Sequence, residues 1–409
     1  MKAEVRVLRN GLRVVLAPCE AESVAFGLFV ASGSRHEPEH FAGISHLIEH
    51  MLFKGTPKRG PLAITRTVEG RGGNFNAWTS EEGTAYYTHM PYEYLDEAVD
   101  VIADMFLHAS IPDDEFARER DVVLEEIKMY QDEPDSVAVE NLQRALFPAS
   151  RLGASVAGSE KTLRALRPED LRRYIRSHYR SDNTVAVLVG RFDPEQAIKV
   201  VSRCLSSLHA ARPRSVAAPA GFGRVVPRTE KEMEVHQLQL ALGFRTFGIG
   251  DPRKYAATVF DAVMGRGMSS RLFQQVRERR GLSYDISSRM QFFSDTGLWM
   301  VTAGVDEGRH TQTVETVNRE FKRIRERPVT AAELRRTKEF LIGNFRLSHE
   351  KVTSKLFFYG QTLQSFGRLV DPEEQVAGIR AVTPDDVRAV ARAILRPANA
   401  SVSIVRPKA

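Results

Sequence analysis

The chain has 409 residues, 42% of them hydrophobic and 27% charged, a composition typical of a globular protein with two domains of about 200 residues each. No run of about 18 apolar residues occurs, so the sequence excludes a membrane-spanning helix. The formal net charge of +6 is spread along many segments without a dense basic block, which argues against a nucleic-acid partner.

The amino-terminal segment is predicted to form a β-hairpin. Apolar residues alternate with polar ones over 5–7 and again over 14–16, and Asn10-Gly11 lies between the two runs. The segment has no apolar core and carries Glu4, which is unlike a signal or transit peptide. The two cysteines, Cys19 and Cys204, are far apart and fit a reducing compartment. We therefore expect a cytoplasmic protein.

The next segment carries three side chains that can serve a metal site. His46, Glu49 and His50 stand in the order His-Leu-Ile-Glu-His. On a helix, His50 lies about 40° from His46 around the axis and Glu49 lies about 60° to the other side. Two imidazoles one turn apart can bind one zinc ion, and a neighbouring carboxylate can accept a proton from water. The order is that of the inverted zincins, so a hydrolase is the leading hypothesis.

A solvated helix with two stray histidines is the alternative interpretation of this motif. The residues around it favour burial instead, because nearly all of the remaining positions from Ile44 to Phe53 carry apolar side chains. Buried histidine and glutamate side chains need polar partners. A metal ion would satisfy all three at once.

Zinc in a catalytic site usually takes three protein ligands, so one more is needed. The helix predicted after Pro112 supplies two acids, Glu119 and Glu126, on an otherwise apolar stripe. Glu125 falls on the opposite, polar stripe, which favours Glu126 as the inward residue. The alternative is a helix edge with surface acids. The stripe consists of Phe116, Glu119, Val122, Val123, Glu126, Ile127 and Tyr130.

An internal repeat divides the chain. Residues 163–190 resemble residues 379–405, and within them Pro168 matches Pro384 and Asn183 matches Asn399 at one offset of 216. Residues 111–126 correspond to residues 329–344 at a nearly equal offset of 218. Helices and strands alternate in both halves, which predicts an α+β fold of two duplicated domains. We expect each domain to contain a mainly antiparallel sheet with helices packed on one face.

The segment rich in Pro, Gly, Ala and Arg between the halves is expected to be a linker. The predicted divisions are a zinc-bearing domain over 1–210, a linker over 211–229 and a homologous domain without metal over 230–409. The second half has no histidine pair at helical spacing, and Asn344 stands where the first half has Glu126. We therefore expect one zinc ion per chain.

The motif, the later Glu126 and the preceding Glu119 together resemble the pitrilysin or insulinase-type zinc metallopeptidases, which include the mitochondrial processing peptidase. The resemblance covers both halves of the chain. It implies that zinc is bound by His46, His50 and Glu126. It also implies that Glu49 is the general base and that Glu119 supports the site.

The resemblance extends to residues that would hold a peptide. Asn76-Ala77, in a segment that alternates as a strand does, matches the edge-strand position to which substrates add in that family. Arg277 and Tyr284 match an Arg-Tyr pair that binds substrate and steadies the reacting carbonyl. Without the resemblance, the first segment would be only a Gly-rich hairpin, and the second a solvated Arg-rich helix followed by a strand tyrosine.

The sequence therefore predicts a zinc-dependent endopeptidase that acts on unfolded peptides or short proteins. In the resembled family four such domains enclose a chamber, so a chain with two domains is expected to form a homodimer or to pair with a related chain. One alternative is a non-catalytic assembly or binding subunit of the same fold. Another is a hydrolase of non-peptide amides, which fits the metal motif but not the edge strand.

Overall fold

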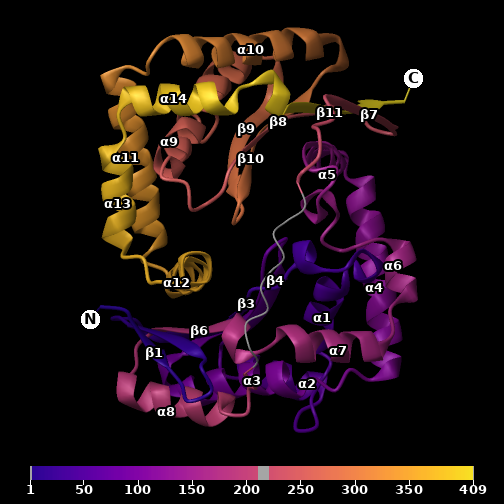
Figure 1. Cartoon of the computed structure of the whole chain (residues 1–409), viewed down its shortest axis with the longest axis vertical. Coiled ribbons are helices and arrows are strands. Elements are labelled where there is room, and N and C mark those ends of the chain that lie inside the picture. Colours follow the sequence, from indigo (N-terminus) through magenta and orange to yellow (C-terminus); the bar gives the residue numbers. More distant parts are fainter. Residues whose placement is uncertain (1, 211–220, 409) are drawn as a thin grey trace. The chain divides into compact units, whose positions relative to one another are not determined.

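The computed structural model describes residues 2–210 and 221–408, which form two compact units (Figure 1). Within these residues the first unit holds 2–127, 155–210 and 347–370, and the second holds 128–154, 221–346 and 371–408. Part of the predicted linker, residues 211–220, lies outside the described residues. The end of that linker belongs to the second sheet, whose first strand begins at Arg228.

The first unit is built on a six-stranded sheet in the order β1-β2-β6-β3-β5-β4. Every neighbouring pair is antiparallel except β2 with β6. The predicted amino-terminal hairpin is formed by β1 and β2, with Gly11 in the left-handed region at φ 84°. The strands are β1 Glu4–Val7, β2 Arg13–Pro18, β3 Ser23–Val30, β4 Asn74–Thr79, β5 Thr84–Pro91 and β6 Thr184–Gly190.

Helices of the first half cover one face of this sheet, and their apolar sides form the largest core of the unit. They are α1 Ile44–Leu52, α2 Pro61–Glu69, α3 Leu95–His108, α4 Asp113–Asp132, α6 Glu160–Ala165, α7 Pro168–His178 and α8 Pro194–Leu205. α4 belongs to this unit as far as Ile127.

The second unit repeats this plan on a five-stranded sheet in the order β7-β11-β8-β10-β9, with only β7 and β11 parallel. Its strands are β7 Arg228–Met233, β8 Leu238–Phe247, β9 Ser283–Phe292, β10 Thr296–Val305 and β11 Ala400–Pro407. Its helices are α5 Pro134–Leu146, α9 Lys254–Met264, α10 His310–Glu326, α11 Ala331–Ser348, α13 Pro372–Ala381 and α14 Pro384–Ile394.

The predicted duplication is confirmed by the topology. In the first half α7 precedes β6, which pairs with β2 and β3; in the second half α14 precedes β11, which pairs with β7 and β8. The repeat segments at 111–126 and 329–344 lie mainly on α4 and α11. The α+β class with mainly antiparallel sheets is therefore confirmed.

The structure adds a reciprocal exchange of helices that the sequence did not predict. α12 (Val352–Phe366) comes from the second half but packs on β3 and β6 of the first sheet (Figure 1). α5 comes from the first half and packs on β8 and β11 of the second sheet. Each sheet is therefore covered on both faces. β6 is buried along its whole length, and its continuous apolar run is the sequence pattern typical of a strand that is covered on both faces.

Close packing under α12 explains the glycine at position 360. A Cβ atom at Gly360 would lie 2.6 Å from the ring of Phe29, so only glycine lets the helix approach the sheet this closely. Leu356 on the same helix is fully buried and also faces the sheet.

Replacing Leu356 with alanine is expected to destabilise the first unit by about 2–5 kcal/mol, because it leaves a cavity between α12 and the sheet. Urea unfolding, monitored by a spectroscopic signal from the first unit, measures the loss in its free energy of unfolding. The matched control is Leu347→Ala, since Leu347 is 63% exposed. An equal effect of both substitutions would contradict the assigned packing of α12.

Candidate metal centre and catalytic site

The motif residues lie on α1, which is buried as the sequence predicts. Ile44, Leu47, Ile48, Met51 and Leu52 all lie in the core. The helix begins after Gly43, which has φ 92° and no side chain to cap the first turn. Glu37 caps it instead, because its carboxylate accepts hydrogen bonds from the backbone N–H groups of Gly43 and Ser45, both at 2.8 Å. A buried carboxylate thus fixes the start of the helix.

The structure brings His46, His50 and Glu126 together. One potential ligand atom from each residue lies within 4.8 Å of the other two. Glu126 Oε2 is 3.8 Å from His46 Nε2 and 3.6 Å from His50 Nε2. Ligand atoms around a tetrahedral zinc ion stand about 3.3 Å apart, given bonds of roughly 2.0–2.1 Å. Two imidazoles and one carboxylate in this arrangement therefore fit a zinc ion with little movement.

Glu119, one of the two acids predicted to face inward, holds the second histidine. It is buried on α4, and its Oε2 lies 3.1 Å from His50 Nδ1. When Nδ1 carries the proton, His50 donates it to Glu119 and its Nε2 lone pair stays available for a metal. Lys54 Nζ lies 2.6 Å from the other carboxylate oxygen of Glu119. Lys54 therefore holds the carboxylate of Glu119, and Glu119 in turn fixes the imidazole of His50.

Replacing Glu119 with alanine is expected to weaken zinc binding by about 10- to 100-fold, because His50 loses the group that orients its ring. Competition with a chromophoric chelator measures the zinc dissociation constant directly. The control is Glu115→Ala on the same helix, whose side chain pairs with Arg118 instead. Unchanged zinc affinity in the Glu119 variant would contradict this supporting role.

The remaining motif residue, Glu49, lies close enough to His50 and Glu126 to interact with both electrostatically, and Thr79 holds its carboxylate. The Thr79 hydroxyl donates to Glu49 Oε2 at 2.5 Å. Burial raises the pKa of the Glu49 carboxyl above its usual value, while the hydrogen bond from Thr79 and the nearby His50 act in the opposite direction. A carboxylate with a raised pKa is a better proton acceptor, which is what a general base needs.

The two histidines differ in their surroundings, and His46 is the more buried. Burial lowers the pKa of the His46 imidazole to about 4; His50 adds to this effect and Glu126 opposes it. A lowered pKa keeps the imidazole neutral at physiological pH. The neutral form is the one that binds a metal.

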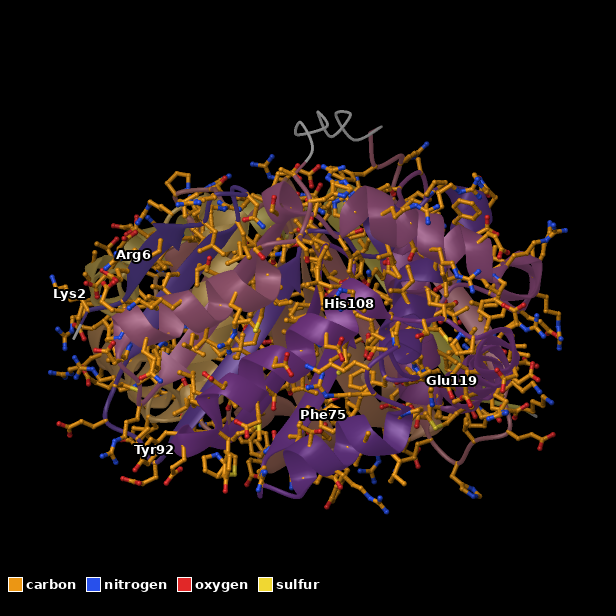
Figure 2. The ribbon with its side chains drawn as sticks, turned by 90° about the horizontal axis from the view of Figure 1, so that it is seen from below. Lys2, Arg6, Phe75, Tyr92, His108 and Glu119 are labelled. Atoms are coloured by element: carbon orange, nitrogen blue, oxygen red, sulfur yellow. The ribbon has the colours of Figure 1, made fainter. Side chains whose placement is uncertain are left out.

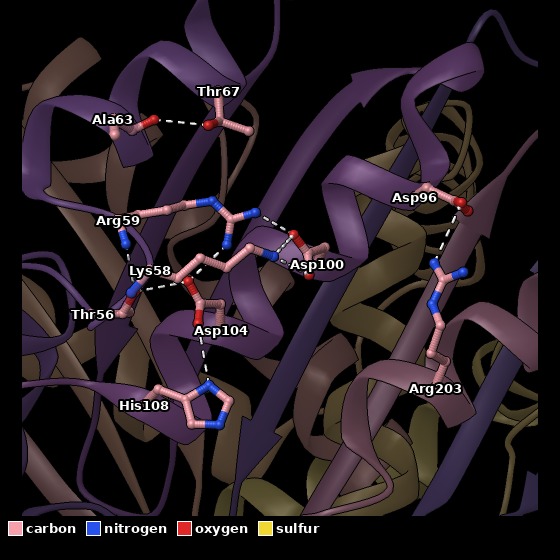
Figure 3. Close-up of polar contacts among 10 residues, drawn as sticks. All are labelled: Thr56, Lys58, Arg59, Ala63, Thr67, Asp96, Asp100, Asp104, His108 and Arg203. Atoms are coloured by element: carbon pink, nitrogen blue, oxygen red, sulfur yellow. Dashed lines mark hydrogen bonds and ion pairs between the residues drawn. The ribbon is translucent and has the colours of Figure 1, made fainter.

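A polar network anchors the loop that follows α1. Asp104 on α3 accepts hydrogen bonds from Thr56 Oγ1 at 2.8 Å and from Arg59 Nη1 at 2.7 Å, and Arg59 also pairs with Asp100 (Figure 3). Asp104 is buried, and Lys58 joins Asp100 at the exposed side of the network. The loop is therefore tied to α3, which limits movement at the carboxyl end of α1.

The sequence predicted correctly which acids of α4 are buried, but not which of its apolar side chains are buried. Glu119 is buried, Glu126 is half-buried and Glu125 is exposed, as the pattern indicated. Val122 and Tyr130 were expected to face inward but are 48% and 44% exposed, so that part of the prediction is wrong. Leu124 is buried in their place, because the buried side of the helix is rotated toward that residue.

Asn76 and Ala77 lie on β4, the last strand of the first sheet, as expected for an edge strand. Among the described residues β4 pairs only with β5. The backbone N–H of Ala77 donates to the side-chain oxygen of Asn76 at 2.8 Å. Phe75, which is labelled in Figure 2, lies on this strand. Its ring packs against that of Phe53, with centroids 5.5 Å apart. An extended peptide could add to this edge through backbone hydrogen bonds.

Arg277 and Tyr284 come together in the second unit. Arg277 lies in the short π-helical segment Phe273–Glu278, and Tyr284 lies near the start of β9. The guanidinium carbon of Arg277 is 5.1 Å from the centroid of the Tyr284 ring, a cation–π distance. Tyr284 is 79% exposed. The pair therefore presents two hydrogen-bond donors at the surface of its unit.

Sequence reasoning missed three residues of this site. Thr79 and Lys54 reach Glu49 and Glu119 from other elements, and Glu37 caps α1 across a turn. No periodicity links any of these residues to its partner. The one available signal was Glu37, an acid shortly before a glycine and a buried helix, which is the charge expected at a helix amino terminus.

The chain is similar to known proteins over nearly its whole length. The family model described as insulinase (peptidase family M16) matches residues 13–160, and the model described as peptidase M16 inactive domain matches residues 165–341. An uncharacterized zinc protease of Bacillus subtilis is 34% identical over 94% of this chain and 93% of the relative. Another from Streptomyces coelicolor is 33% identical over 98% of this chain and 88% of the relative. The chain belongs to the M16, or insulinase, family of peptidases.

Solved structures share the fold. A protease from Helicobacter pylori matches with a TM-score of 0.93 and 19% identity over 99% of both chains. A protein from Pseudomonas fluorescens, described as a peptidase M16 inactive domain, matches with a TM-score of 0.92 and 19% identity over 100% of this chain and 98% of that one. Within the described residues, no helix is long and apolar enough to cross a membrane.

Proposed function

We propose that this chain is a zinc-dependent endopeptidase that hydrolyses unfolded peptides or short proteins. The observation that carries the proposal is the convergence of His46, His50 and Glu126 beside the carboxylate of Glu49. The relatives that are named zinc proteases support it, since they match nearly the whole chain.

The roles follow from the chemistry of each group. His46, His50 and Glu126 would hold one zinc ion per chain, with Glu119 fixing the ring of His50. Zinc bound there would polarise the scissile carbonyl and make a nearby water more acidic. Glu49 would accept a proton from the attacking water and pass it to the departing amine.

Substrate binding is assigned to groups in both halves of the chain. The edge of β4 at Asn76 and Ala77 would receive the peptide as an added strand, which accounts for a preference for unfolded chains. Arg277 would bind the substrate, and the Tyr284 hydroxyl would donate to the developing oxyanion. We propose a zinc-bearing domain over 1–210, a linker over 211–229 and a second domain over 230–409. The second domain would contribute residues that bind the peptide.

The assembly we propose is a homodimer, in which two chains supply four domains around the substrate. A heterodimer with a related chain is the alternative, but both the zinc motif and the Arg277–Tyr284 pair are present here, so two copies suffice. We also propose a cytoplasmic location, from the low cysteine content. Chromatography with mass measurement tests the assembly, and a fully active monomer would overturn it.

A second candidate function is that of a non-catalytic subunit that binds or assembles with another peptidase-like chain. It is favoured by the family model for residues 165–341, whose description is an inactive domain. The potential metal ligands of the first half oppose it.

One experiment separates the two functions. The zinc-loaded full chain is incubated with a broad panel of quenched peptides, with and without a chelator, and the products are identified by mass. We expect cleavage within the peptides, lost with the chelator and restored by zinc. A protein that holds stoichiometric zinc and cleaves no member of the panel would favour the non-catalytic subunit.

A further inference from the structure

The hydroxyl of Thr79 donates a short hydrogen bond to the carboxylate of Glu49. Thr79 is the last residue of β4, and its Oγ1 donates to Glu49 Oε2 at 2.5 Å in a partly buried setting. Because this bond holds Oε2, it restricts the directions in which the rest of the carboxylate can turn. Burial limits competition by water for the same hydrogen bond.

The backbone around Thr79 is held in place by neighbouring segments. The turn after β4 is closed by the Ser80 N–H, which donates to the Gly83 carbonyl at 2.8 Å. The Ser34 N–H donates to the Ser80 carbonyl at 3.1 Å, and the Arg35 N–H donates to the Glu81 carbonyl at 2.8 Å. These bonds fix the end of β4 relative to the sheet, so the Thr79 hydroxyl is presented from a rigid position.

We propose that Thr79 is a positioning residue that orients the Glu49 carboxylate and sets it in register with a peptide bound along β4. The inference rests on the proposed function. Strand residues advance by about 3.3 Å each, so the backbone of Ala77 lies about 7 Å from that of Thr79 along the strand. One strand therefore carries both the proposed peptide contacts and the anchor of the base.

A purely structural role for Thr79 makes the opposite prediction for two substitutions. Valine keeps the β-branched shape that suits a strand but removes the hydroxyl, whereas serine keeps the hydroxyl and loses the methyl group. If Thr79 only packs the hairpin, Thr79→Val is harmless and Thr79→Ser is the damaging change. If it positions Glu49, the order is reversed.

The first test is kinetic and uses the zinc-loaded full chain with a quenched peptide. Thr79→Val is expected to lower kcat by about 10- to 100-fold, since a small displacement of a reacting group costs a factor of that size, while KM and zinc content stay unchanged. Thr79→Ser is expected to retain kcat within about threefold, because the donor is kept. An equal fall in both variants, or a change in KM alone, would overturn the proposal.

Thr88→Val is the matched control. The Thr88 hydroxyl donates to the Asn74 carbonyl at 2.9 Å, so it also ties down β4, but at the end of the strand away from Thr79. Its loss is expected to leave kcat unchanged. A fall equal to that of Thr79→Val would show that general loosening of the strand, and not the contact with Glu49, causes the effect.

The second test needs no activity. Crystal structures of the zinc-loaded wild type, Thr79→Val and Thr79→Ser show where the Glu49 carboxylate lies. We expect it to leave its wild-type position only in the valine variant; an unmoved carboxylate there would overturn the proposal. A wild type that cleaves no peptide would refute the proposed function, and the position of Glu49 would still decide the role of Thr79.

Discussion

Replacement of Glu49 with glutamine is expected to lower peptide hydrolysis about 1000-fold, within the range that general acid–base catalysis contributes. The amide can still accept the hydrogen bond from Thr79 but cannot take a proton from water. Because Glu49 is not among the three potential ligands, the zinc content should equal that of the wild type. Steady-state cleavage of a quenched peptide, with metal analysis of the same samples, gives both results.

The control for this substitution is Glu125→Gln, which removes one exposed carboxylate from the first half of the chain. It should retain full activity. If the Glu49 variant keeps more than a tenth of the wild-type kcat, another group serves as the base and the proposed role of Glu49 is wrong.

Replacement of Glu126 with glutamine is expected to remove zinc from the protein under conditions that keep the wild type loaded. The loss should exceed the roughly 10- to 100-fold effect of removing an outer partner, because a charged ligand becomes neutral. Glu125→Gln makes the same chemical change at the adjacent helical position and should bind zinc as the wild type does. Competition with a chelator measures both affinities.

This pair of variants also tests the helical phase on which Glu126 was chosen. If the two substitutions weaken zinc binding equally, the effect comes from net charge, and neither carboxylate is a ligand. If only the Glu125 variant loses zinc, the orientation of α4 is wrong.

The sequence predicted those parts of the structure that periodicity determines. The apolar residues around His46 and His50 require a buried helix, and the structure contains it. The phase of α4 distinguished Glu126 from Glu125, because the two positions lie about 100° apart around the helix. The same reasoning failed for Val122 and Tyr130 because side chains near the border of a stripe can lie on either side.

The exchange of α5 and α12 could not be predicted from these patterns. An amphipathic helix reveals that it has an apolar face but not which sheet covers that face. The close approach of Gly360 to Phe29, and of Leu142 to Gly243, depends on partners far away in the sequence. The continuous apolar run of β6 would have indicated two covered faces.

The contacts that orient the candidate site were equally hidden. Lys54, Thr79 and Glu37 act through single hydrogen bonds or ion pairs, and such contacts leave no repeat in the sequence. The metal-capable residues could be named because histidine and glutamate at helical spacing form a recognisable motif. The residues that hold them in place became visible only when the chain was folded.

Anomalous diffraction from crystals of the zinc-loaded protein, collected on both sides of the zinc absorption edge, is the most direct test of the central claim. We predict one strong peak per chain, about 2.0–2.2 Å from His46 Nε2, His50 Nε2 and a carboxylate oxygen of Glu126. A peak bound by other side chains, or no peak at these residues in saturated crystals, would contradict the account.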